Sequence, residues 1–406
     1  MVVPMRYTIS DFQNSYVGRV RCIAGTGGLS RPISEVALLD YELVPGLKNT
    51  YQRVNFYENQ LVLTSFLYAR ESPHLITEAV KYLIAQGTSG LAVRNVFHIP
   101  IPEQALRYAN ARNYPLFLVT DDTLYFDHLV YEVNHRAREL AATNYVQKTI
   151  DAILLHAEDG KEVRKRAEEL NPSFKPEFIA VHLRLDEALT VTEFSDVEHT
   201  YLSSELAACE NVFACHREGI VMIVSADTEQ ELDARKIERE LGASRILPHL
   251  GARLKGLGIS SRRFGLEGIG GALLEAIQAS RFSERAEGEA RRYDELGMYR
   301  TILPFIGAPQ LERFASGVLT PLREHDSEHG TSLEMTLQSY IACGRSIDET
   351  ARELGQHANT IRYRLDRIGA LTGLDFRRVD DADQLAQACR IAVVGELFPA
   401  YERPWA

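Results

Sequence analysis

Near the C-terminus, residues 346–368 bring asparagine, threonine, tyrosine and arginine side chains close together in the sequence. On a helix of about 3.6 residues per turn, Asn359 and Tyr363 lie on one side. Thr360, Arg362 and Arg367 flank them. Arginine can bond guanine through two hydrogen bonds, asparagine can bond adenine in the same way, and arginine also binds phosphate. This combination predicts contact with double-stranded DNA.

Two short helices must position these side chains. Ser346 and Glu349 have the spacing of a capping box, in which each side chain bonds the backbone amide of the other. The first helix has an apolar stripe, namely Ile347, Ala351 and Leu354. Gly355 is expected to end it in the left-handed conformation. The second helix has its own apolar stripe, with Arg364 near its edge, namely Ile361, Leu365 and Ile368. Such a pair forms a helix-turn-helix, although an ordinary hairpin with a solvated arginine face has the same spacing.

The amino-acid sequence of this stretch favours the helix-turn-helix over the ordinary hairpin. HANTIRYRLDRIGALTG closely resembles the C-terminal helix-turn-helix of PucR/CdaR-type bacterial transcription regulators and, more distantly, the Fis-type domain. The resemblance extends from Leu333 to Val394, with Gln356 where the family often has a small apolar residue. It implies that five residues face DNA, namely Asn359, Thr360, Arg362, Tyr363 and Arg364.

Composition bounds the remaining possibilities. A chain of 406 residues with 45% hydrophobic content should form two to four domains with buried cores. It has neither an apolar run long enough to span a membrane nor a signal-peptide pattern, which favours a cytoplasmic protein. Its five cysteines are scattered without a CxxC pair, so free thiols are expected and neither a metal site nor a cofactor is predicted.

The net charge of −11 argues against non-specific coating of nucleic acid. The arginines that could meet DNA gather in one small region. One weakly basic module binds weakly alone, whereas two half-sites multiply the affinity. A homodimer, or a higher even oligomer, is therefore expected.

Residues 1–125 predict an α/β domain with a parallel sheet. Strands are expected at 20–25, 33–39, 60–66, 89–93 and 114–120. Helices are expected at 72–87, with Ser72 as N-cap and Pro73 first in the helix, and from Pro102 to about Arg112. The segments AGTGGLSRPISEVALLD, NQLVLTSF, LIAQGTSGLAV and NYPLFLVTDD resemble the PucR-type N-terminal domain. This resemblance implies a domain that senses a small effector.

Ligands of open α/β sheets bind beyond the carboxyl ends of the strands. The polar residues at those ends are the candidate effector site, namely Thr64, Ser65, Arg94, Asn95, Thr120 and Asp121. They are otherwise loop residues of a structural or dimerising domain. GTGGLS (25–30) lacks the GK[ST] ending of a phosphate loop and predicts a turn.

Residues 126–176 predict a helical linker. One long amphipathic helix is expected to end near Gly160, as a dimer seam or a spacer, before NPSFKP (171–176). Residues 177–288 predict a second α/β domain, whose element order resembles the GGDEF-like domain of CdaR-type regulators. A working nucleotide cyclase needs carboxylates to hold Mg²⁺. The turn here is Arg217-Glu218-Gly219-Ile220, and the first strand offers Val181, His182 and Arg184, so no catalytic site is predicted.

The remaining segments complete the organisation. Two connecting helices (290–307 and 309–326) are expected within 289–330, the helix-turn-helix domain at 331–395, and a tail at 396–406. The expected fold is thus two α/β domains followed by a small all-α, Fis-like domain. The leading interpretation is a DNA-binding regulator of a catabolic operon that responds to a small effector. The alternatives are a nucleotide-processing enzyme using an α/β domain and a protein-interaction adaptor.

Overall fold

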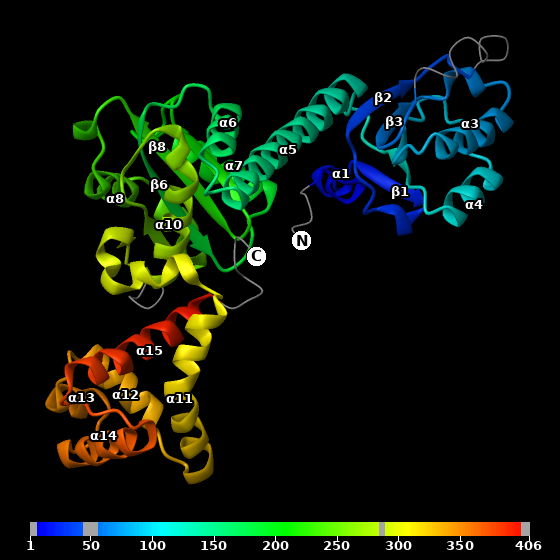
Figure 1. The fold of residues 1–406 in the computed structure, drawn as a ribbon. Helices are drawn as coiled ribbons and strands as arrows, with labels where there is room; N and C mark the ends of the chain where they lie inside the picture. Colours follow the sequence, from blue (N-terminus) through cyan, green and yellow to red (C-terminus); the bar gives the residue numbers. More distant parts are fainter. Residues whose placement is uncertain (1–5, 44–55, 284–288, 399–406) are drawn as a thin grey trace. The chain divides into compact units, whose positions relative to one another are not determined.

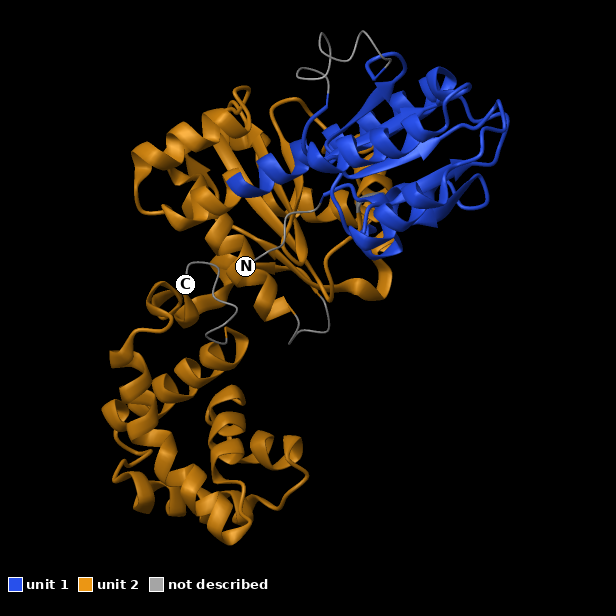
Figure 2. Cartoon of the chain, turned by 90° about the vertical axis from the view of Figure 1, so that its right-hand side faces the viewer, with its two compact units in different colours: residues 1–148 blue, residues 149–406 orange. Residues whose placement is uncertain are grey.

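The computed structural model describes residues 6–43, 56–283 and 289–398. The chain divides into two compact units, residues 1–148 and 149–406 (Figure 2). Each unit has its own β-sheet, and the second also holds the C-terminal helices (Figure 1). The expected fold class, with α/β regions followed by an all-helical segment, is confirmed.

The first sheet has the strand order β1-β5-β4-β3-β2. Neighbouring strands from β2 to β5 are parallel, and β1 is antiparallel to β5 at one edge. The predicted strands are confirmed as β1 (Val20–Ala24), β2 (Glu35–Leu39), β3 (Gln60–Thr64), β4 (Gly90–Val93) and β5 (Leu116–Val119). All residues of β3 and β4 are buried, which explains why their sequences are continuous apolar runs.

The described residues of this unit form α1 (Ile9–Ser15), α3 (His74–Ala85) and α4 (Glu103–Ala111), and α5 (Phe126–Leu155) starts in it. The predicted cap of α3 is wrong by one residue, because Pro73 occupies the cap position and makes no side-chain cap bond. The predicted turn at GTGGLS is confirmed. Gly25 has a φ of +72°, and a Cβ there would lie 1.9 Å from the carbonyl oxygen of Tyr114.

The linker forms two helices where one was predicted. Helix α5 ends at Leu155, and α6 (Gly160–Leu170) begins at the residue where the single helix was expected to end. The Asp159 side chain accepts hydrogen bonds from the amides of Lys161 and Glu162, so it caps the new helix.

The second sheet has the strand order β11-β9-β6-β8-β7, and β10 (Arg263–Phe264) also pairs with β6. Its other strands are β6 (Glu177–Leu185), β7 (Val212–His216), β8 (Gly219–Ala226), β9 (Leu254–Ile259) and β11 (Arg291–Arg292). Helix α10 (Ile269–Ser283) packs across β6 and β9. Gly256 and Gly258 permit this contact, since a Cβ at either would lie 2.1 Å from a carbonyl oxygen of α10. The remaining helices are α7 (Val191–Leu202), α8 (Ala234–Ala243) and α9 (Ile246–Leu250).

The helix predicted at 290–307 is wrong. The segment forms strand β11 and then the 3₁₀ segments η7 (Tyr293–Thr301) and η8 (Leu303–Phe305). Gly297 interrupts η7 with a φ of +56°. Tyr293 and Leu296, three residues apart, share one buried cluster with Phe282 of α10. Spacing by three residues fits a 3₁₀-helix, in which positions i and i+3 lie on one side.

Five helices follow in the described part of the chain, namely α11 (Pro309–His329), α12 (Leu333–Ala342), α13 (Ile347–Glu353), α14 (Ala358–Thr372) and α15 (Val379–Leu397) (Figure 1). All five contribute buried residues to a common core. Helix α11 extends into the predicted polar connection at 325–332. There, Asp326 accepts hydrogen bonds from the amides of Leu333 (2.7 Å) and Glu334 (3.0 Å) and so caps α12.

The Asp326→Ala substitution is expected to lower the free energy of unfolding by about 1 kcal/mol at neutral pH. Burial disfavours the ionised form of Asp326, but the bonds from Leu333, Thr331 and Glu334 outweigh it and lower the pKa. A carboxyl whose pKa is lowered by folding stabilises above its unfolded pKa of about 3.9. This stabilisation is lost as the pH falls through the folded pKa.

Thermal melting followed by circular dichroism, at neutral pH and again below pH ~3.9, measures this effect. The difference between wild type and variant should shrink in acid. The exposed neighbour Ser327 supplies the control Ser327→Ala, which should melt like the wild type. An Asp326→Ala deficit that stays the same in acid would contradict the assignment.

Leu365→Ala is expected to destabilise the C-terminal helices by about 2–5 kcal/mol, because it opens a cavity in their shared core. Tyr363→Ala, two residues away and 71% exposed, should change stability by less than about 0.5 kcal/mol. Urea denaturation of both variants checks the pair. Equal losses would show that the two faces of α14 are not distinguished by burial.

Candidate nucleic-acid interface

Helices α13 and α14 form the predicted helix-turn-helix. The Ser346 side chain accepts a hydrogen bond from the Glu349 amide (3.3 Å) and starts α13. Between these two residues the structure records no return bond from the Glu349 side chain, so the predicted capping box is half formed. Gly355 adopts the predicted left-handed conformation, with a φ of +61°. His357 then caps α14, its Nδ1 accepting from the Asn359 amide (3.2 Å).

One face of α14 is buried as the spacing predicts. Ile361 and Ile368 are 0% exposed, and Leu365 is 7% exposed. These side chains pack against residues of α11, α12, α13 and α15 in one cluster. Because four helices hold this face, the direction in which the opposite face points is fixed.

The opposite face is exposed and polar. Asn359, Arg362, Tyr363 and Arg367 are exposed there, and Thr360 is half-buried at the edge. Arg362 Nη1 donates to Asn359 Oδ1 over 2.9 Å, which orders both side chains before any ligand arrives. This surface offers arginine and amide donors together with an exposed tyrosine, the groups that bond base edges and phosphates.

Arg364 lies apart from the other predicted contacts. It is half-buried, and its Nη1 donates to the hydroxyl of Thr336, a buried residue of α12, over 3.0 Å. In this arrangement it ties α14 to α12. Arg367 makes a bond that the sequence did not predict, from its Nε to His325 Nε2 of α11 (3.2 Å). The residues are 42 apart in sequence, so no local pattern signals this contact.

The candidate effector residues lie at the carboxyl ends of three neighbouring strands, as predicted. Thr64 ends β3, and its carbonyl accepts from the Arg94 amide after β4 (2.9 Å). Thr120 and Asp121 follow β5. The structure therefore brings members of the set to one edge of the sheet. The strand order β5-β4-β3-β2 does not reverse, however, so these strands lack the crevice that forms at a reversal.

Several of these polar groups bond to neighbouring loops. Asn95 exchanges two hydrogen bonds with the Ile99 backbone, both 2.8 Å long. Asp121 accepts from both the amide and the hydroxyl of Thr123 and pairs with Arg19, and these contacts lower its pKa to about 2. Arg94 donates to the Asp122 carbonyl, while its Nε is buried and has no hydrogen-bond partner among the described residues.

The turn that would serve catalysis in a nucleotide cyclase is held by side chains of another kind. His216 Nε2 and the Arg217 guanidinium both lie 3.1 Å from Asp151 Oδ1 of α5. Burial alone would raise the pKa of Asp151, but His216 and Arg217 outweigh it and lower the pKa. His182, on the first strand, bonds Ser280 of α10 over 2.8 Å. Burial lowers its pKa to about 3, so it is uncharged at neutral pH.

Within the residues that the structure describes, no three histidine, cysteine or acidic side chains gather in a way that could hold a metal ion. Nor does any helix there combine the length and apolarity needed to cross a membrane.

Three family models match the chain in succession. The model of the purine catabolism regulatory protein-like (PucR) family matches residues 12–136. The GGDEF-like domain matches residues 156–282, and the PucR C-terminal helix-turn-helix domain matches residues 333–391. The matched residues thus include the first sheet, most of the second, and the exposed face of α14.

Known proteins give similar matches. The purine catabolism regulatory protein of Bacillus subtilis is 25% identical over 274 residues, 64% of this chain and 49% of that protein. The proline-responsive transcriptional activator PutR of the same organism is 28% identical over 103 residues, a quarter of each chain. The chain thus spans about half the length of the first relative. The crystal structure of a regulator of polyketide synthase expression from Bifidobacterium adolescentis covers 62% of this chain and 93% of its own, at 20% identity and a TM-score of 0.32.

Both curated relatives are named as regulators, in agreement with the prediction that the chain is not an enzyme. The middle region is similar to a GGDEF-like domain and lacks carboxylates at the metal-binding positions predicted from the sequence. The chain thus carries, in order, a PucR N-terminal domain, a GGDEF-like domain and a PucR C-terminal helix-turn-helix domain.

Proposed function

We propose that this protein binds promoter DNA and regulates transcription of a catabolic operon. The observation that carries the proposal is the exposed face of α14, where Asn359 and Arg362 are paired and Tyr363 stands free of the core. A recognition helix in the major groove reads bases through its exposed polar side chains. A regulator of this kind acts on chromosomal DNA, so the proposal places the protein in the cytoplasm.

The protein acts as a homodimer or a higher even oligomer in this proposal. The chain carries a net charge of −11, so its body is repelled by DNA and contributes little non-specific affinity. Two recognition helices on adjacent half-sites give an affinity for DNA that a single helix does not reach. A small effector shifts the affinity for DNA by binding two arrangements of the oligomer unequally. The proline-responsive relative supports such a response.

The effector site of the proposal remains the strand-end edge of the first sheet. Thr64, Ser65, Arg94, Asn95, Thr120 and Asp121 are the candidate residues. The buried Nε of Arg94 is the feature there that most favours a ligand with an acceptor oxygen, because a buried donor without a partner is costly.

Arg362→Ala is expected to remove about 1–3 kcal/mol of specific DNA binding, since it deletes donors that bond a base edge. Fluorescence anisotropy on DNA upstream of the gene and its neighbours measures the change, at about 150 mM salt, where non-specific binding is weak. The double variant Asn359→Ala/Arg362→Ala should bind more weakly still.

Arg107→Ala is the matched control, because it removes one exposed arginine of α4, outside the helix-turn-helix. It should bind like the wild type. Operator affinity equal to wild type in a folded Arg362→Ala protein would reject the assigned role. Binding that is insensitive to salt would favour the adaptor alternative, because contacts with phosphate are strongly salt-dependent.

The oligomer is tested by sedimentation velocity on the full chain and by footprinting on the operator. We expect an even oligomer and two protected half-sites about 34 Å apart, one turn of DNA. A monomer that protects a single half-site with full affinity would contradict this part of the proposal.

A further inference from the structure

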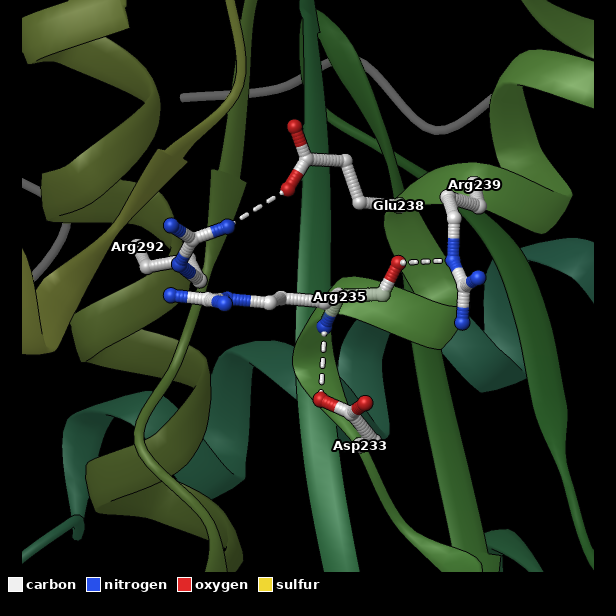
Figure 3. A pocket seen from close by; sticks show the side chains of 5 residues that line it. All are labelled: Asp233, Arg235, Glu238, Arg239 and Arg292. Carbon is white, nitrogen blue, oxygen red and sulfur yellow. Dashed lines mark hydrogen bonds and ion pairs between the residues drawn. The ribbon is translucent and has the colours of Figure 1, made fainter.

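A pocket of about 630 Å³ in the second unit is lined by charged side chains (Figure 3). They come from α8, from the residue that caps it, and from β11, namely Asp233, Arg235, Glu238, Arg239 and Arg292. Pockets for apolar ligands are lined mainly by hydrophobic side chains. A pocket with this lining instead suits a charged, polar molecule.

The charged side chains of the pocket differ in whether they have partners. Arg292 Nη1 bonds Glu238 Oε2 over 2.7 Å, and Arg292 also pairs with Glu295 of η7. The Asp233 carboxylate accepts from the Arg235 amide over 2.9 Å, so it caps the helix. Both carboxylates that line the pocket are therefore engaged with groups of the protein.

The Arg235 guanidinium is the group in the pocket that is best placed to bind a ligand. Figure 3 shows this side chain extending from α8 across the pocket towards Arg292. Within the described ranges, no carboxylate forms an ion pair with it. A guanidinium has five N–H donors in a planar fork that matches the oxygens of a carboxylate or a phosphate. Two such groups facing one space repel each other unless an anion lies between them.

We propose that this pocket binds a small molecule through an oxyanion, a phosphate or a carboxylate, placed between Arg235 and Arg292. Arg239 adds a third positive charge at the rim; its Nε bonds the Arg235 carbonyl over 3.4 Å. The three arginines outnumber the two lining carboxylates. This site goes beyond the proposed function, because its ligand binds whether or not the protein binds DNA.

Because Arg292 also pairs with Glu295, an anion bound to Arg292 would affect that ion pair. Glu295, its second partner, belongs to the segment between β11 and α11, the first of the C-terminal helices. An oxyanion in the pocket competes with Glu295 for the same guanidinium. Occupancy of the site therefore loosens one ion pair at the start of the connection to the helix-turn-helix.

Isothermal titration calorimetry on the full chain tests the site with inorganic phosphate and, separately, with malonate. Both titrations are made against chloride at equal ionic strength. We expect saturable binding to the wild type, and an affinity for the preferred anion that falls at least about tenfold in Arg235→Ala. The stronger of the two anions assigns the ligand to the phosphate or the carboxylate class.

Lys236→Ala is the matched control, because it removes one positive charge from the next residue of α8, which does not line the pocket. It should bind the anion like the wild type. Arg235→Lys keeps the charge but loses the planar fork, and should bind with intermediate affinity; it also serves if the alanine variant does not fold.

Two results would overturn the proposal. One is the absence of saturable binding of either anion to the wild type. The other is an equal loss in Arg235→Ala and Lys236→Ala, which would show that general charge and not the pocket holds the anion. No DNA is present in these titrations, so either result leaves the proposed regulation of transcription untouched.

Discussion

The burial of one face of α14 is the constraint on which the candidate interface depends. Ile361, Leu365 and Ile368 lie in a core shared with the neighbouring helices, so the helix cannot rotate about its axis without exposing apolar surface. The direction of the exposed side chains is thereby set by residues of the buried face. Arg364 belongs to this support, since its bond to Thr336 adds a polar tie between α14 and α12. Under the proposed function, recognition and stability are thus divided between two sides of one helix.

The second unit contains a GGDEF-like domain, in which the polar side chains at the turn and on the first strand have structural roles. At the turn and on the first strand, histidine and arginine stand where a cyclase needs carboxylates. These groups bond side chains within the same unit: His216 and Arg217 share Asp151, and buried His182 bonds Ser280. Arginine is abundant at the pocket beside α8 as well.

Much of this could be predicted from the sequence, wherever a local pattern and the tertiary structure agree. The apolar runs gave the strands of the first sheet, and the spacing of α13 and α14 gave the helix-turn-helix. The failures share a physical cause. The segment at 290–307 has helical spacing but forms 3₁₀ turns, because Tyr293 and Leu296 must reach a core built by distant helices. Asp326 caps a helix seven residues away, and Arg367 bonds a residue 42 positions away. A reading window of about 11–18 residues does not contain the Arg367 pair, and the usual capping patterns do not reach across seven residues to Asp326.

The glycines of β9 have a consequence for genetics. Gly256 and Gly258 have low strand propensity, and they persist in a strand because α10 approaches them too closely for any side chain. A substitution at either position would separate helix from sheet while leaving every exposed side chain of α14, Arg362 among them, unchanged in the sequence. Mutants selected for loss of regulation would therefore include changes in this strand that act through protein abundance alone. The positions of such mutations would therefore identify residues that stabilise the fold as well as residues of the proposed DNA interface.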